Sequence, residues 1–375
     1  MKLMTGAAHL ILFLVALEVT SRIDDGIRFG TPMMSRVISS EDLREQDGAS
    51  IQGRPNARYQ KWALNDLGLR GPPAKRERTP GTLRIVAVGG SETFGLTESA
   101  GLEYPRQLED SLNAARGRAP HLPTFEVLNA ALPGMALPSI ERDLLHRVRT
   151  LQPDVVLVYP SPSFYVDRDP PHAPTDVHPA GALPLSRAFR PRVLGRLTNS
   201  IKGLLPGPML RWLRQRDIDD EVNQYPPEWR FTSVPEVRLK MFDHDIRSMV
   251  GSIRAIGAEP VLATHGNAFM GGAASATGDL AQAWVRFYPR STAQTLISFD
   301  SAAREVTLQV ARDSGVVAVD VAASLARAPD AVYSDFVHFT DRGAARVAAT
   351  LREPLIAVAS RANVSRVAAT RLAAP

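Results

Sequence analysis

The stretch IVAVGGSETFG, residues 85–95, decides the fold class, because an apolar run ends abruptly at two glycines and a serine. Apolar residues that end in glycines predict a buried strand followed by a tight loop. In α/β proteins, loops of this kind often carry functional groups. The stretch therefore raises the question of which chemistry is served by the turn at Gly89, Gly90 and Ser91.

Two common turn motifs fit this stretch poorly. From Gly90 to Thr97 the sequence approaches a phosphate-binding loop, but Leu96 stands where that loop has its lysine, and leucine cannot neutralise phosphates. The nucleophile elbow of α/β-hydrolases needs a glycine two residues after its serine, where this chain has Thr93. The remaining hypothesis is a serine nucleophile on a looser turn, which requires a base elsewhere in the chain.

The size and composition of the chain limit the class of protein. With 375 residues, of which 44% are hydrophobic and 22% charged, the sequence predicts a globular protein. The net charge of +5 comes from 44 basic and 39 acidic residues spread along the chain, without the dense basic block typical of nucleic-acid binding. Because the chain has no cysteine, disulfides, thiolate metal sites and a cysteine nucleophile are excluded. We expect no nucleic-acid partner, no metal and no cofactor.

The amino terminus has the pattern of a targeting segment. Lys2 precedes an apolar run over residues 7–17, which is shorter than an ordinary membrane span of about 20 residues and matches a signal-peptide core. No clear small-residue cleavage site follows it. Residues 1–22 are therefore interpreted as a signal anchor or a signal peptide. The alternative is a helix that docks on the domain, which His9 within the run favours.

The rest of the chain divides into a polar lead-in and a regular pattern. Residues 23–80 are broken by Pro and Gly and predict a linker and lead-in segment. Over residues 81–361 strands alternate with helices, which predicts one three-layer α/β/α sandwich with a parallel sheet. An insertion at about 160–235 interrupts this pattern, and residues 362–375 form a tail. The expected strands are 83–90, 125–131, 154–159, 259–266 and 316–321, and the expected helices are 104–115, 139–150, 237–256, 300–313 and 341–359.

A base for Ser91 is expected in the last loop of the domain, YSDFVHFTDRG, residues 333–343. Parallel sheets gather functional loops at the carboxyl ends of their strands. Asp335 and His338 stand three residues apart directly before a helix, so one turn can present an imidazole to Ser91 and a carboxylate to the other ring nitrogen. Taken alone, these two residues fit equally well a loop aspartate and a half-buried histidine without a catalytic task.

The order of these blocks resembles the SGNH/GDSL hydrolase superfamily. The resemblance covers about residues 60–361 and implies a flavodoxin-like fold and the hydrolysis or transfer of ester-linked acyl groups. It is closest to bacterial members that are membrane-anchored or periplasmic, which implies an inner-membrane anchor facing the periplasm, or a secreted or periplasmic protein. The segments that carry it, besides the serine turn, are NDLGLRGP (65–72), YPRQLEDSLN (104–113), VLNAALPG (127–134) and PDVVLVY (153–159).

The resemblance also implies a role for each motif residue. Ser91 would be the nucleophile, His338 the base and Asp335 the residue that orients the base. The backbone N–H of Gly134 would donate to the oxyanion that forms on the substrate carbonyl.

One departure from the family pattern concerns the oxyanion hole. After VVLVY the family has an asparagine, whereas this chain reads Pro-Ser-Pro-Ser over 160–163. Ser163 aligns with the missing asparagine, and its hydroxyl can donate one hydrogen bond. Asn267, in THGN at the end of a later strand, is a second amide that could reach the same space.

Three functions stay open on the sequence. The first is a serine esterase that acts on a small ester or an acylated saccharide through an acyl-enzyme. The second is an acyltransferase that modifies a cell-envelope glycan with the same three residues. The third is a non-catalytic SGNH-like binding protein, which the missing asparagine favours. The oligomeric state is not indicated.

Overall fold

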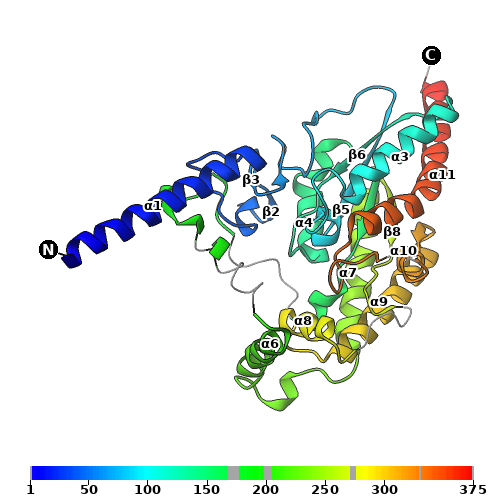
Figure 1. The fold of residues 1–375 in the computed structure, drawn as a ribbon. Helices are drawn as coiled ribbons and strands as arrows, with labels where there is room; N and C mark the ends of the chain where they lie inside the picture. Colours follow the sequence, from blue (N-terminus) through cyan, green and yellow to red (C-terminus); the bar gives the residue numbers. More distant parts are fainter. Residues whose placement is uncertain are drawn as a thin grey trace.

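A five-stranded parallel sheet forms the centre of the molecule in the computed structural model, which describes residues 2–167, 177–181, 183–193, 195–197, 205–270, 276–328 and 331–373. The strand order is β6-β5-β7-β8-β9, and β5, β6 and β8 of this sheet are labelled in Figure 1. The first strand in sequence thus lies between the second and third, which is the flavodoxin-like order, and the predicted fold class is confirmed. The strands are β5 Thr82–Gly89, β6 Thr124–Asn129, β7 Val155–Tyr159, β8 Glu259–Ala263 and β9 Val317–Val319.

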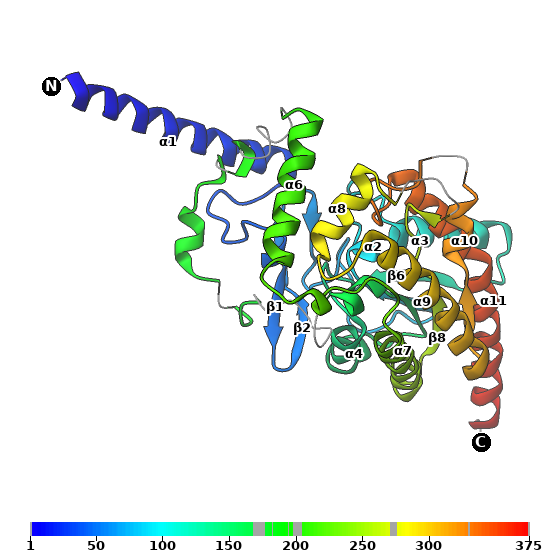
Figure 2. The ribbon, with the colours of Figure 1, turned by 90° about the horizontal axis from the view of Figure 1, so that it is seen from below.

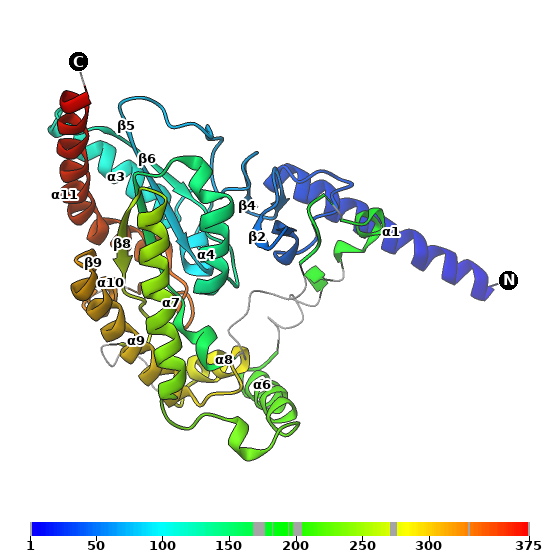
Figure 3. The ribbon, with the colours of Figure 1, turned by 180° about the vertical axis from the view of Figure 1, so that it is seen from behind.

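Helices cover both faces of this sheet because alternate strand residues point to opposite sides. Val86 and Val88 of β5 pack with α4, α7 and α9, whereas Ile85 and Ala87 pack with α3 and α11. In the view from behind, α7 passes in front of β8 (Figure 3). The helices of these layers are α3 Tyr104–Arg118, α4 Leu137–His146, α7 Glu236–Ala255, α9 Ala293–Ser314 and α11 Asp341–Ala373.

Some helix ends differ from those expected. Helix α9 begins seven residues before the expected 300, because the Thr292 side chain caps it by accepting a hydrogen bond from the backbone N–H of Thr295 at 3.1 Å. Helix α11 continues to Ala373, through most of the segment expected to be a tail.

The other, mostly shorter helices lie between these elements in the sequence, in the lead-in segment and in the insertion. They are α2 Ser91–Phe94, α6 Gly207–Val222, α8 Asp279–Phe287, α10 Val321–Ala326, η1 Glu41–Leu43, η2 Val148–Leu151, η3 Pro162–Val166, η4 Leu185–Phe189 and η5 Pro227–Trp229.

The lead-in segment differs from the linker that its composition indicated. It forms two hairpins, and it adds four buried leucine and isoleucine side chains to the core cluster under α4. Its strands are only two to four residues long, too short to show an alternating pattern in the sequence. The strands are β1 Arg44–Asp47, β2 Ser50–Gly53, β3 Arg58–Tyr59 and β4 Trp62–Ala63, and the buried side chains are Leu43, Ile51, Leu64 and Leu69.

A buried arginine fastens the end of the lead-in segment to the sheet. Arg84 of β5 has no exposed surface, and its Nε donates to Glu126 Oε2 on the neighbouring strand at 2.7 Å. Its other nitrogens donate to the backbone carbonyls of residues 75–77 at 2.7–3.2 Å and to that of Leu151. One side chain thereby satisfies backbone carbonyls of two separate segments and pairs with a carboxylate on a third.

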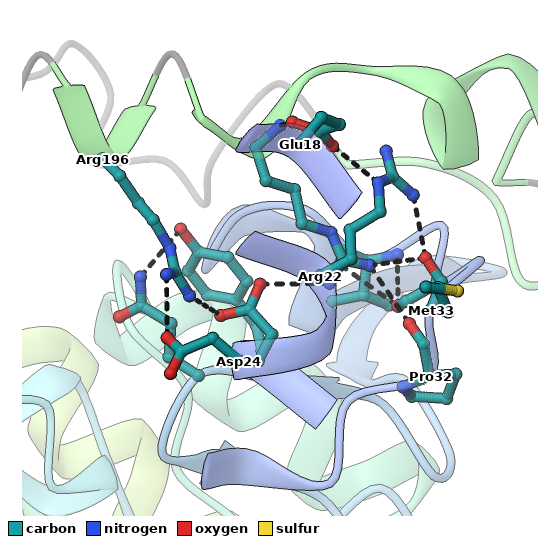
Figure 4. A network of polar contacts seen from close by, with 12 residues as sticks. Glu18, Arg22, Asp24, Pro32, Met33 and Arg196 are labelled. Atoms are coloured by element: carbon teal, nitrogen blue, oxygen red, sulfur yellow. Dashed lines mark hydrogen bonds and ion pairs between the residues drawn. The ribbon is translucent and has the colours of Figure 1, made fainter. Parts of the chain in front are cut away.

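The first helix, α1 Lys2–Phe29, extends away from the rest of the chain (Figure 2). Its second half is held at the body, where Glu18 accepts from Arg22 and Arg22 donates to the carbonyls of Met33 and Ala188 at 2.7–2.8 Å (Figure 4). Apolar side chains over residues 11–19 are 38–67% exposed. No helix in the described part of the chain is both long and apolar enough to span a membrane.

Candidate active site

The turn after β5 packs tightly against its own next residues and against the segment that follows β7. A Cβ atom on Gly89 would lie 2.3 Å from Thr93 Oγ1, and one on Gly90 would lie 2.7 Å from Ser161 Oγ. Both distances are too short for a real contact, so neither position accepts a side chain without a shift of its neighbours. The two glycines therefore let Ser91 begin the short helix α2 directly at the edge of the sheet, against the segment that follows β7.

The structure brings Ser91, His338 and Asp335 together in hydrogen-bonding order. His338 Nε2 lies 2.8 Å from Ser91 Oγ, and His338 Nδ1 lies 2.7 Å from Asp335 Oδ2. The other oxygen, Asp335 Oδ1, accepts from the backbone N–H groups of Val337 and His338, both at 2.9 Å. This local turn fixes the carboxylate, so that Nδ1 of the imidazole donates to it and Nε2 accepts the proton of Ser91.

The surrounding charges favour the protonated form of His338. Burial alone would lower its pKa, but the hydrogen bond and charge of Asp335, together with the charges of Glu92 and Glu98, raise the pKa above its ordinary value. Burial would raise the pKa of Asp335, but its hydrogen bonds and the charge of His338 lower it. The pair is thus arranged to take up a proton from Ser91 and to hold it.

A second histidine network lies beneath the first and was not predicted. His265, which follows β8, places Nε2 at 3.1 Å from Glu92 Oε1 and Nδ1 at 2.8 Å from Asp300 Oδ1. Glu92 Oε2 in turn accepts from Ser161 Oγ at 3.0 Å and lies 3.4 Å from Ser91 Oγ. Glu92, His265 and Asp300 are all at most 4% exposed, so the network is a buried charge cluster in contact with the predicted nucleophile.

The charges of this cluster are mutually dependent. Burial would lower the pKa of His265, but Asp300 and Glu92 on either side raise it far above its ordinary value. Burial would likewise raise the pKa of Glu92, but His265 lowers it. His265 is therefore a cation between two carboxylates and donates both of its ring protons, which leaves it no lone pair with which to accept another.

The sequence contained one signal for this network. His265 stands immediately after an apolar strand, at the carboxyl edge where a parallel sheet gathers its functional groups. Its partners, however, are 173 and 35 residues away in the chain, and no local spacing connects them. Such a contact can be recognised only when the order of the strands in the sheet is known.

The three residues expected in the oxyanion hole differ in their positions and in their hydrogen-bond partners. Gly134 lies in the turn after β6 with φ of +82°, and Arg44 of the lead-in segment donates to the neighbouring Pro133 carbonyl at 2.6 Å. Ser163 is buried in η3, after β7. Asn267 is joined elsewhere: its Nδ2 donates to Asp300 and its Oδ1 accepts from the backbone N–H of Phe269 at 2.9 Å. Asn267 therefore belongs to the His265 network.

Comparison with known proteins gives structural but no sequence matches. No family model and no curated protein matches the chain. A lipase/acylhydrolase from Enterococcus faecalis is 14% identical over 73% of this chain and 96% of its own, with a TM-score of 0.43. An α/β hydrolase from the metagenome of Lake Arreo, Spain, is 11% identical over 74% and 95%, with a TM-score of 0.42. A catalytic mutant of the acetylxylan esterase Axe2 from Geobacillus stearothermophilus is 14% identical over 72% and 92%, with a TM-score of 0.41. At values this low, the chemistry of the site has to be argued from its own side chains.

Proposed function

We propose that this protein is a serine esterase that cleaves an acyl ester of a small alcohol or saccharide through an acyl-enzyme. The observation that carries the proposal is the continuous hydrogen-bonded chain from Ser91 through His338 to Asp335, at 2.8 and 2.7 Å. An unactivated hydroxyl is a weak nucleophile, and an adjacent imidazole oriented by a carboxylate is the arrangement that activates it.

The reaction proceeds in two halves. Ser91 Oγ attacks the ester carbonyl carbon while His338 Nε2 takes its proton, and His338 then returns that proton to the leaving alcohol as the ester C–O bond breaks. The acyl group remains on Ser91. Water then attacks the acyl carbon with His338 as base, and the carboxylic acid leaves as Ser91 regains its proton. Asp335 stabilises the imidazolium in both halves.

The oxyanion of each tetrahedral intermediate needs donors at the same edge of the sheet. We assign the backbone N–H of Gly134 and the hydroxyl of Ser163 to this role. Ser161 is a poor alternative, because its single hydroxyl proton is donated to Glu92, which only accepts in its charged form.

A serine-reactive fluorophosphonate tests this proposal directly. We expect wild-type protein to form a covalent adduct that peptide mass spectrometry locates on Ser91. The matched control is Ser324→Ala on α10, which removes a hydroxyl that is hydrogen-bonded to Thr350 of α11, and it should label like wild type. Absence of any adduct, together with no ester cleavage, would support the non-catalytic alternative.

We further propose that α1 tethers the protein to a membrane, on the periplasmic face if the chain is exported. The support is the exposure of Ile11, Leu12, Phe13, Leu14 and Val15, which are consecutive and so cover more than a full helical turn. Deleting residues 2–17 keeps Glu18 and Arg22 at the body and should move the folded protein from the membrane fraction to the soluble fraction. Full-length protein found in the soluble fraction would contradict the tether.

A further inference from the structure

A basic cleft lies beside α2, where its lining residue Arg70 packs on Phe94. Its volume is about 810 Å³, within the range of ligand-binding clefts. Five basic side chains and one carboxylate line it, from α1, the second hairpin, the chain after it and the start of α3. These are Arg28, Arg58, Lys61, Arg70, Arg106 and Glu103.

Arg70 is the residue that indicates a ligand. It is 7% exposed, yet its Nε and Nη2 are buried without a hydrogen-bond partner in the described part of the chain. Nη2 is 4.0 Å from Glu103 Oε2, which is beyond hydrogen-bond distance. Burial lowers the pKa of Arg70 despite the nearby carboxylates, but a guanidinium remains charged in proteins. A buried cation with unused donors gains from an anion that enters the cleft.

The charge of the cleft is only partly neutralised by the chain itself. Arg28 and Arg106 pair with acidic side chains on their own helices, at 2.7 Å each. Arg58 and Lys61 donate to neutral backbone carbonyls, also at 2.7 Å each. An anionic ligand in the cleft would therefore be attracted by Arg58, Lys61 and Arg70. Among the lining residues that the structure describes, Glu103 is the one negative charge that would repel it.

The cleft is connected to the catalytic side chains by short steps. The Arg70 guanidinium lies over the ring of Phe94, which ends α2 three residues after Ser91, at 5.5 Å from the ring centroid. Lys61 Nζ donates to the Thr97 carbonyl, and Thr97 Oγ1 donates to the Phe339 carbonyl next to His338 at 2.6 Å. Two side chains that line the cleft, Arg70 and Lys61, are thus linked to the two catalytic segments: Arg70 contacts α2 directly, and Lys61 reaches the segment of His338 through Thr97.

We propose that this cleft binds an anionic group, a carboxylate or a phosphate, on the saccharide side of the ester that Ser91 cleaves. The substrate class deepens the esterase proposal and rests on it, although binding in the cleft can be measured without catalysis. Arginine forks bind carboxylate and phosphate oxygens in pairs. A volume of about 810 Å³ also leaves room for sugar rings beside the charged group.

The test is calorimetric titration of the full-length protein with trigalacturonic acid, with sodium phosphate and with neutral maltotriose. We expect trigalacturonic acid to bind at low salt, more weakly as salt rises, and maltotriose to bind at least tenfold more weakly. Binding of phosphate without trigalacturonic acid would assign the charged group as phosphate. Binding of neither anion would overturn the proposal.

The double variant Arg58→Gln/Lys61→Gln changes side chains of the cleft that lie outside the buried core. It should weaken anion binding tenfold or more. The matched control is Arg116→Gln/Arg118→Gln, which removes the same charge from the last turn of α3 and should bind like wild type. An equal loss in both double variants would show nonspecific attraction and overturn the site.

Kinetics separate the two proposals. For the Arg58→Gln/Lys61→Gln variant, kcat/KM should fall at least tenfold more on acetylated trigalacturonic acid than on p-nitrophenyl acetate. Equal losses on both esters would overturn the cleft as a substrate site. Absence of hydrolysis of either ester by the wild type, with anion binding intact, would reject the esterase and leave the anion site standing.

Discussion

Two histidines lie beside the helix that begins at Ser91, and they differ in the hydrogen-bond partner of Nε2. His338 has a carboxylate at Nδ1 and the Ser91 hydroxyl at Nε2, whereas His265 has a carboxylate at each nitrogen. The side chain of His338 is 12% exposed and that of His265 is 2% exposed. Both residues are histidines, but only the His338 ring can change its protonation during a reaction.

This difference explains how both histidines fit into one site. His338 in its neutral form offers a lone pair to a hydroxyl, which is what a general base needs. His265 has no free lone pair, and its positive charge keeps Glu92 ionised beside Ser91. The first ring is suited to proton transfer, and the second is suited to hold buried charge in place.

The largest effect on kcat is expected from removing Ser91 or His338, the two residues that exchange the proton. Ser91→Ala and His338→Ala should each lower kcat for ester cleavage by roughly 10⁴-fold or more, and the double variant should lose little further, because the two residues act as a unit. Asp335→Asn should retain more activity, since it disturbs the tautomer and leaves the nucleophile in place. Steady-state kinetics on p-nitrophenyl acetate measures this, and additive losses would contradict a shared role.

The second expectation concerns stability and tests the other ring. His265→Gln leaves Glu92 and Asp300 buried without their cation, and breaking a buried charge network of this kind costs about 3–5 kcal/mol of unfolding free energy. His338→Gln, the matched control at the partly exposed ring, should change the urea midpoint far less. Equal midpoints for the two variants would remove the distinction between the rings.

The pH dependence of this stability has a definite sign. The pKa of His265 is raised on folding, so its contribution is complete below its ordinary pKa of about 6.5 and is lost as pH rises through the folded value. The difference in unfolding free energy between wild type and His265→Gln should therefore shrink at alkaline pH. A difference that grows with pH would show that His265 is neutral in the folded protein.

A third, smaller effect distinguishes two serines after β7. Ser163→Ala should lower kcat about tenfold or more with little change in KM, since an oxyanion donor acts mainly in the transition state, and Ser163→Asn should raise it. Ser161→Ala is the comparison on the His265 side and should have a weaker effect on kcat. An active enzyme indifferent to Ser163→Ala would exclude Ser163 as the donor.

The smallest expected effect is a shift in the pH profile of kcat/KM when Glu92, which lies between the two rings, loses its charge. The base must be neutral to act, so kcat/KM should rise with pH through the pKa of His338. Glu92→Gln removes a charge that raises this pKa and should shift the acid limb to lower pH by roughly one unit. Glu259→Gln, at the amino end of β8, is the control. A shift to higher pH would contradict the assigned electrostatics.

The sequence was informative where chemistry depends on local spacing. Asp335 and His338 are three residues apart, and the turn between them is fixed by backbone donors that any sequence supplies, so their pairing could be predicted. The contact between Glu92 and His265 depends on the order of the strands, which periodicity alone does not provide. The lead-in residues Leu43 and Ile51 were missed because the 3₁₀ turn and the four-residue strand that carry them are too short to show a readable period.

Arg84 has a consequence for the order in which the molecule folds. The carbonyls of residues 75–77 find their donor on β5, and that side chain is fully enclosed only when β6 and the chain before β7 are in place. Residues 75–77, at the end of the lead-in segment, therefore lack their hydrogen-bond donor before the central strands have paired. We expect amides of β5 to gain protection from hydrogen exchange earlier during refolding than those of β1 and β2, and the reverse order in pulse labelling would show that the hairpins form first.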